Sequence, residues 1–204
     1  MNLPNKITIS RIIMSVIILV MLVLPWHALG VEWPVYGRIF NITLETGLSL
    51  KYVIAGISFV IAALTDRIDG YLARKNNQVT DLGKMLDAIA DKILVNGVLV
   101  ILAYERMIPL VVPVVIITRD TITDTCKMIS GNKGKVVAAS WMGKIKTVFM
   151  MTGTSLVFFN NLPFELIHFK FATLCLIIGT VLSVVSGCQY YFKTMELIKE
   201  PKKK

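Results

Sequence analysis

Residues 66–92 read DRIDGYLARKNNQVTDLGKMLDAIADK and combine five aspartates with five basic residues and two glycines. The chain around this stretch has 204 residues, of which 55% are hydrophobic and 17% are charged. A typical soluble domain is less apolar and carries more charge. The composition therefore indicates a membrane protein, and so many charges in one stretch of it indicate a functional site.

Apolar stretches long enough to cross a membrane recur along the chain. A bilayer core of about 30 Å needs about 20 mostly apolar helical residues. The predicted spans cover residues 6–25, 47–66, 82–104, 109–130, 138–160 and 166–192. We expect the first span to be a mature helix, because WHALGVEW offers a poor signal-peptide cleavage site. The fold predicted is a single all-α domain over residues 1–204, a polytopic membrane protein with six transmembrane helices.

The basic residues predict the orientation of these spans. If both termini are cytoplasmic, the external connections hold only Arg38 and Arg106, with Lys51 and Lys170 near span ends. The excess of Lys and Arg inside favours this arrangement in the cell membrane. The basic tail, residues 199–204, is expected to lie against anionic membrane lipids. The net charge of +9 therefore requires no nucleic acid as a partner.

The segment over residues 26–49 is the one long external connection, and it is rich in aromatic residues. Aromatic side chains of this kind gather at the level of the headgroups. We therefore expect a reentrant or surface-lying segment.

Cysteine and histidine give no sign of a soft-metal site. Cys126, Cys175 and Cys188 show no pairing or ligand spacing, so we expect them to be small apolar fillers. His27 and His168 lie near the predicted external face, which argues against a zinc centre.

The aspartates of the opening stretch have helical spacing. Asp66 and Asp69 are three positions apart and Asp87 and Asp91 are four apart, so each pair projects from one helix face. The intervening KNNQVTDL suits a turn between antiparallel helices. The four carboxylates are thus predicted to meet just inside the cytoplasmic membrane surface, where burial makes them costly. A hard divalent cation such as Mg²⁺ is the partner that such oxygen ligands prefer.

The glycines and the arginine beside these acids indicate the chemistry. Gly70 and Gly83 allow helix backbones to approach closely, and Arg74 supplies a planar fork for phosphate oxygens. Carboxylate-held Mg²⁺ next to an arginine is typical of phosphoryl transfer. A transporter is the alternative from another class, but its acids are expected near the bilayer midplane.

The same residues carry a resemblance to a known family. Their full pattern resembles the signature of the CDP-alcohol phosphatidyltransferases, and it comprises Asp66, Asp69, Gly70, Ala73, Arg74, Gly83, Asp87 and Asp91. Three further patches, PNKITISR, GKIKT and SGCQYYF, are similar to the bacterial phosphatidylglycerophosphate synthase branch. TRD at residues 118–120 departs from that branch, which more often has glutamate after the arginine.

The resemblance implies a reaction. Phosphatidyl transfer from CDP-diacylglycerol to sn-glycerol 3-phosphate, with release of CMP, is expected; inositol phosphate or serine is the alternative acceptor. The resemblance also implies a homodimer.

The resemblance further implies a role for each motif residue. Asp66, Asp69 and Asp87 would hold two divalent cations, Mg²⁺ or Mn²⁺, while Asp91 completes the cluster and acts as general base. The residues implied for CDP-diacylglycerol binding are Asp66, Asp69, Gly70, Ala73, Arg74 and Gly83.

Basic residues near the motif are candidates for the acceptor site. Arg119 lies deep in the fourth span, and arginines at such depth usually face a cavity or a partner. Lys135, Lys144 and Lys146 are predicted on the same cytoplasmic side, where positive-inside bias alone would also place lysines. A structural ion pair of Arg119 with a nearby aspartate is the alternative, although spacings of one and five residues do not favour it.

Asn5, Thr8 and Arg11 recur every three residues on the first predicted helix. This spacing forms one polar face where an apolar face is expected. We interpret it as part of the lining of the acceptor cavity, with a snorkelling Arg11 beside a helix cap as the alternative.

Overall fold

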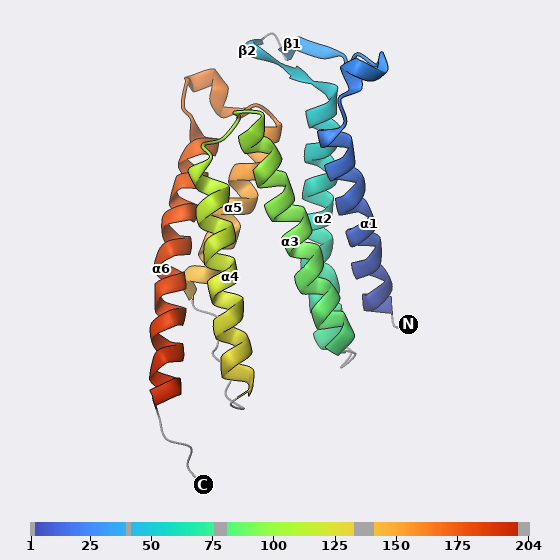
Figure 1. The fold of residues 1–204 in the computed structure, drawn as a ribbon. Helices are drawn as coiled ribbons and strands as arrows, with labels where there is room; N and C mark the ends of the chain where they lie inside the picture. The colour runs from blue at the N-terminus through green and yellow to red at the C-terminus, as the bar shows by residue number, and fades with distance from the viewer. Residues whose placement is uncertain (1–2, 40–41, 76–80, 133–140, 200–204) are drawn as a thin grey trace.

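The computed structural model describes residues 3–39, 42–75, 81–132 and 141–199. Within these residues the chain forms six α-helices (Figure 1). Their bounds are α1 Leu3–Val23, α2 Leu50–Lys75, α3 Asp81–Tyr104, α4 Val111–Asn132, α5 Trp141–Phe158 and α6 Phe171–Lys199. Each predicted span overlaps one of these helices, so the presence and order of six helices are confirmed.

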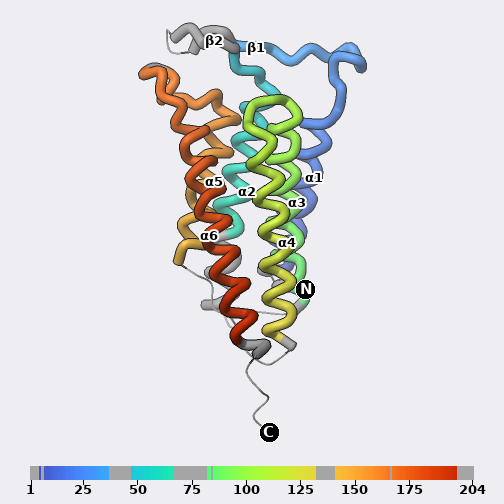
Figure 2. Tube along the Cα trace, turned by 60° about the vertical axis from the view of Figure 1, so that its left-hand side comes forward, coloured from blue at the N-terminus to red at the C-terminus, as the bar shows by residue number. Residues whose placement is uncertain are grey.

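The helices run up and down, so that both termini lie at the same end of the bundle (Figures 1 and 2). The connection from α1 to α2 crosses the opposite end, as do the turns between α3 and α4 and between α5 and α6. The last of these includes the short 3₁₀ helix η2 (Phe164–Ile167). The end that holds the termini also holds the C-terminal half of α2 and the start of α3, which carry the aspartate motif.

The bundle consists of two groups of three helices. In one group α1 packs against α2 and α3, and in the other α6 packs against α4 and α5. The groups meet where α2 contacts α5 and where α3 contacts α4. Figure 1 shows them as the right and left halves of the molecule.

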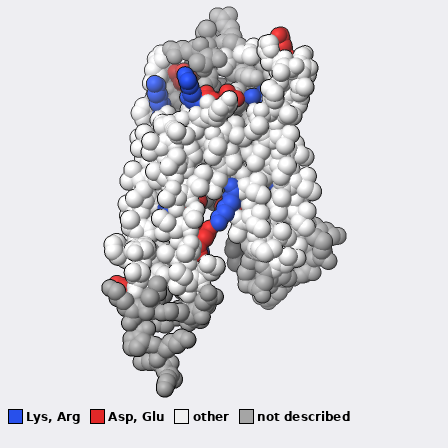
Figure 3. All heavy atoms as spheres, in the orientation of Figure 1, with Lys and Arg blue, Asp and Glu red and all other residues white. Residues whose placement is uncertain are grey.

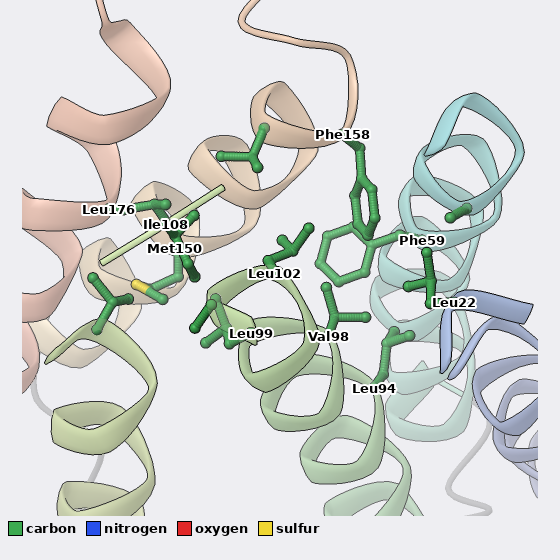
Figure 4. Close-up of a cluster of buried hydrophobic side chains, with 14 of the residues drawn as sticks. Leu22, Phe59, Leu94, Val98, Leu99, Leu102, Ile108, Met150, Phe158 and Leu176 are labelled. Carbon is green, nitrogen blue, oxygen red and sulfur yellow. The ribbon is translucent and has the colours of Figure 1, made fainter. Parts of the chain in front are cut away.

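Aromatic and aliphatic side chains join the two groups in the core (Figure 4). Phe59 on α2 and Phe158 on α5 are fully buried, with ring centroids 5.8 Å apart. Leu94, Val98 and Leu102 of α3 belong to the same buried cluster. Gly56 allows this close approach, because a Cβ there would lie 2.8 Å from the Cβ of Phe158.

The outward faces of the helices are apolar. Large exposed hydrophobic residues line α1 and α6, among them Ile13, Val16, Ile17, Val20, Ile177, Val181 and Val184. Within the described residues, one helix, over Phe171–Glu196, is long and apolar enough to cross a membrane, and Ile7–Val23 is a shorter apolar helix. The arrangement of six membrane spans therefore stays a prediction.

The connection between α1 and α2 corrects the sequence-based expectation of a purely helical chain. It forms a short 3₁₀ helix, η1 (Trp26–Leu29), and an antiparallel hairpin of β1 (Val35–Ile39) and β2 (Ile42–Ser49). Strand residues such as Val, Ile, Thr and Tyr are frequent there. These residues favour strands, but the aromatic residues of the same segment led us to predict a surface-lying segment instead.

The expectation for the cysteines is confirmed at two positions and wrong at one. Cys126 and Cys175 are buried, as small apolar fillers should be, whereas Cys188 is exposed. Cys188 lies on α6 next to the exposed residues Gln189 and Tyr191.

Removal of the aromatic contact between the two groups should destabilise the protein. Phe158→Ala deletes a fully buried ring at the α2–α5 contact, and we expect a loss of about 3 kcal/mol in the free energy of unfolding. Thermal unfolding of the purified protein in detergent measures the loss. Phe192→Ala is the matched control, because the Phe192 side chain is 65% exposed. Equal losses in the two variants would contradict this account of the core.

Candidate active site

Two motif aspartates from neighbouring helices converge on one side chain. Asp66 lies on α2 and Asp87 on α3, and both accept from the guanidinium of Arg11 on α1. One terminal nitrogen of Arg11 pairs with each carboxylate. Because a single guanidinium bridges them, these two of the four carboxylates lie close together, as expected if a turn makes the two helices antiparallel.

The burial of Arg11 contradicts the alternative of a snorkelling side chain. Its side chain is only 2% exposed, so it does not snorkel toward solvent. Within the described residues, Arg11 is also absent from the lining of the cavity that contains Arg119. Asn5 and Thr8 are buried on the same face of α1 and likewise lie away from that cavity lining. Their assignment to acceptor binding stays a prediction.

The fourth aspartate of the motif faces a different space. Asp91 follows Asp87 by one helical turn on α3 and lines a cavity of about 360 Å³ between α3, α4, α5 and α6. Charges on both sides act on its carboxylate: Arg11 and Asp87 on one side, and Asp120 and Lys146 on the other. Asp91 therefore links the aspartate pair to the cavity.

Basic residues from α4 and α5 line the same cavity. Arg119, Lys144 and Lys146 are all present there, opposite the motif helix α3. Figure 3 shows basic and acidic side chains together in a hollow between the two halves of the molecule. Three of the four predicted acceptor-site cations near the motif are thus brought together, while Lys135 lies outside the described residues.

Arg119 is held in place by neighbours on two helices. Its Nε donates to the backbone oxygen of Ser183 at 3.2 Å and one terminal nitrogen donates to the hydroxyl of Ser186 at 2.8 Å, both on α6. Its other terminal nitrogen donates to Asp120 at 2.9 Å. Lys146 donates to the same Asp120 oxygen at 3.0 Å.

The pair of Arg119 with Asp120 corrects the expectation that adjacent residues would not pair. The two contacts with α6 turn the guanidinium along the surface of α4, where it reaches the neighbouring carboxylate. Helix spacing alone does not predict this ion pair, because Ser183 and Ser186 of α6 also hold the long Arg119 side chain.

A glycine on α6 makes room for Arg119. A Cβ at Gly187 would lie 2.8 Å from the Cγ of Arg119. Ser186 and Gly187 both belong to the patch SGCQYYF. Within this patch, Ser186 accepts a hydrogen bond from Arg119 and Gly187 leaves space for the Arg119 side chain.

Lys92, Asp124 and Lys127 form an ion cluster that the sequence analysis missed. Lys92 on α3 pairs with Asp124 on α4, and Lys127 donates to the other Asp124 oxygen at 3.4 Å. All three residues line the cavity. One signal was available, since Asp124 lies one helical turn after Asp120 and therefore shares its helix face.

Several predicted residues cannot be placed at the level of side chains. The backbone of α2 includes four of them, but their side chains lie outside the described part: Asp69, Gly70, Ala73 and Arg74. The predicted turn at residues 76–80 is also outside it. Gly83 lies in the first turns of α3 and is half-buried.

The donor set at Asp66 and Asp87 fits a divalent cation. Carboxylate oxygens from two helices converge at one point, and a positively charged group already stands there. Hard cations such as Mg²⁺ and Mn²⁺ take oxygen ligands of this type. Among the described residues no group of three or more His, Cys, Asp or Glu side chains gathers to hold a metal, and the Asp69 side chain is not among those described.

Comparisons with known proteins agree with the motif. A family model for CDP-alcohol phosphatidyltransferase matches residues 1–185. The chain is 39% identical over 201 residues to the CDP-diacylglycerol-glycerol-3-phosphate 3-phosphatidyltransferase of Bacillus subtilis, covering 97% of each chain. Proteins of the same name from Haemophilus influenzae and Rickettsia bellii are 30% and 28% identical, over 93% of this chain in both cases and 91% and 93% of their own lengths. The chain therefore belongs to the CDP-alcohol phosphatidyltransferase family.

Proposed function

We propose that the protein transfers the phosphatidyl group of CDP-diacylglycerol to sn-glycerol 3-phosphate, giving phosphatidylglycerophosphate and CMP. The observation that carries this proposal is one cavity lined by the motif aspartate Asp91 and by Arg119, Lys144 and Lys146. A general base and several cations around one space suit an acceptor that has both a hydroxyl and a phosphate. The relatives named above support the same acceptor.

The proposed setting is the cell membrane. The six helices, of 18 to 29 residues, correspond to about 27 to 44 Å at 1.5 Å per residue, close to or above the bilayer core thickness of about 30 Å. Six spans with both termini cytoplasmic would place the motif end of the bundle in the cytoplasm, where a soluble acceptor is available. We propose one domain over residues 1–204. The homodimer implied by the family stays a prediction.

The aspartates would hold the cofactor. Asp66, Asp69, Asp87 and Asp91 are the proposed ligands of two divalent cations, Mg²⁺ or Mn²⁺. When bound, these ions would neutralise the diphosphate of CDP-diacylglycerol and stabilise the charge that develops on the departing CMP. Gly70, Ala73, Arg74 and Gly83, with Asp66 and Asp69, are proposed to line the site of the CDP group.

The cations of the cavity would orient the acceptor. A guanidinium has five N–H donors and an ammonium has three. Within the described residues, Arg119 uses three of its donors on Asp120, Ser183 and Ser186. The remaining donors of Arg119, together with those of Lys144 and Lys146, would bind the acceptor phosphate and keep it away from the aspartates.

Asp91 would complete the reaction as general base. It lines the cavity in which the cations would hold the acceptor phosphate, so the acceptor hydroxyl has a carboxylate within the same space. The hydroxyl proton passes to Asp91 as the acceptor oxygen bonds to the phosphorus of the phosphatidyl group. The bond between that phosphorus and the CMP oxygen breaks, and CMP leaves with the electron pair.

Acceptor choice is tested by a panel assay. We expect purified protein in nanodiscs with CDP-diacylglycerol and Mg²⁺ or Mn²⁺ to release CMP with sn-glycerol 3-phosphate, but not with inositol phosphate or serine. Mass spectrometry identifies the lipid product. Turnover with inositol phosphate or serine alone would reassign the acceptor, and no CMP release with any of them would refute the transferase activity.

Neutral variants should separate the metal ligands from the base. Asp66→Asn is expected to abolish turnover and weaken CDP-diacylglycerol binding, because the metal that holds the diphosphate loses a ligand. Asp91→Asn should lower the turnover rate by about 10² or more with donor binding retained. Turnover rates and direct donor binding are measured side by side, with Glu165→Gln at the opposite end of the bundle as control. Equal loss of donor binding in both variants would make Asp91 chiefly a ligand.

Arg119 should affect the acceptor more than the donor. Arg119→Ala removes charge-assisted hydrogen bonds of about 1.5 to 3 kcal/mol, so the Michaelis constant for sn-glycerol 3-phosphate should rise roughly 10- to 100-fold. Gly187→Ala should shift the same constant less, because its Cβ would push a flexible side chain. Steady-state kinetics with each substrate varied in turn give both constants.

The matched control for this helix-packing change is Gly131→Ala on α4, where a Cβ would meet nothing within 4 Å in the described structure. An Arg119→Ala effect on the donor constant alone would show that Arg119 is not the phosphate ligand.

A further inference from the structure

Arg11 is a buried cation on α1 that contacts motif aspartates on two other helices. Its side chain is 2% exposed, and its two terminal nitrogens pair with Asp66 on α2 and Asp87 on α3. A guanidinium with no counter-charge at this depth would be strongly unfavourable. The position of Arg11 therefore depends on these two carboxylates, and their closeness depends on Arg11.

Few other groups hold the guanidinium in place. Within the described residues, the Nε of Arg11 is buried and has no hydrogen-bond partner. The local polar contact on α1 involves the backbone oxygen of Arg11, which accepts from Ser15 at 2.7 Å. Among the described residues, the ion pairs of the Arg11 side chain are thus those of its charged tip with the two carboxylates.

The same carboxylates are the proposed ligands of a divalent cation. A carboxylate has two oxygens, and Arg11 occupies one oxygen of Asp66 and one of Asp87. A cation bound between these side chains would compete with Arg11 for carboxylate oxygens and would be repelled by the positive charge of Arg11. The arginine and the metal therefore compete for one site.

From this geometry we propose that Arg11 is a positioning residue that serves as the built-in counterion of Asp66 and Asp87 when no divalent cation is bound. It holds the two carboxylates together in the metal-free protein and gives up part of their oxygens when the cation binds. This role, which rests on the proposed function, differs from the acceptor binding expected from the sequence. It makes the divalent-cation affinity lower than the aspartates alone would give.

The test measures Mn²⁺ binding rather than turnover. Free Mn²⁺ is followed by electron paramagnetic resonance during titration of the full-length protein in detergent without substrates. Arg11→Met removes the charge and keeps a long apolar chain, so Mn²⁺ should bind about tenfold or more tightly than to the wild type. A residue with only a structural role would weaken binding when replaced. Unchanged or weaker binding in Arg11→Met would overturn the proposal.

Further variants keep the test decisive. Arg11→Gln should also bind Mn²⁺ more tightly and replaces Arg11→Met if that variant does not fold, whereas Arg11→Lys keeps the charge and should stay close to the wild type. Lys51→Met is the control, because it removes one positive charge at the opposite end of the bundle, where Lys51 lies 3.9 Å from Glu105. It should leave Mn²⁺ affinity unchanged.

Thermal unfolding in EDTA gives a second readout. The metal-free Arg11→Met and Arg11→Gln proteins should melt below the wild type, and Mn²⁺ should raise their melting temperatures by more than it raises that of the wild type. If the wild type binds no Mn²⁺, the metal assignment itself fails together with this proposal. If the wild type binds Mn²⁺ and the neutral Arg11 variants bind it no better, only the role of Arg11 fails.

Discussion

Charge compensation at one end of an apolar helical bundle is the constraint on which the rest of the structure depends. Asp66 and Asp87 are brought together by the packing of α2 and α3, and their repulsion is offset by Arg11 from α1. Three helices are joined by this one group of side chains. Arg11 is buried, and a buried charge is stable only when it has a partner, so the relative placement of the three helices depends on these ion pairs.

In the group formed by α4, α5 and α6, basic side chains are also paired, but with different partners. Arg119 and Lys146 share Asp120, and α6 contributes a backbone oxygen and a hydroxyl to Arg119. Basic residues outnumber acidic ones in the lining of this cavity, whereas two carboxylates share one guanidinium at Arg11. Asp87 and Asp91, one helical turn apart on α3, connect the two halves. Asp87 pairs with Arg11, and Asp91 lines the cavity that contains Arg119. An acidic and a basic site side by side are suited to a metal-bound diphosphate and an anionic acceptor.

Much of this arrangement could be predicted from residue spacing. Apolar stretches of about 20 residues predicted the six helices, and the intervals of three and four residues predicted that Asp66 shares a face with Asp69 and Asp87 with Asp91. The convergence of Asp66 and Asp87 was predicted because a short turn makes neighbouring helices antiparallel, whereas the predicted meeting of all four carboxylates stays a prediction. The hairpin between α1 and α2 was not predicted, since the aromatic residues of this connection indicated a surface-lying segment instead. The Lys92 contact with Asp124 was not predicted either, because it joins helices that meet only after folding.

The sequence by itself determined the helical bundle, the spacing of the metal-ligand candidates and the family, because these depend on periodicity and on residue types at fixed intervals. Only the tertiary structure decided which charges become partners. Arg11 pairs with Asp66 and Asp87, contacts that were not predicted, and Arg119 pairs with Asp120, an alternative that helix spacing had disfavoured. The physical reason is that long basic side chains extend over several ångströms, so their partners are chosen by the helices packed around them and not by their place in the chain.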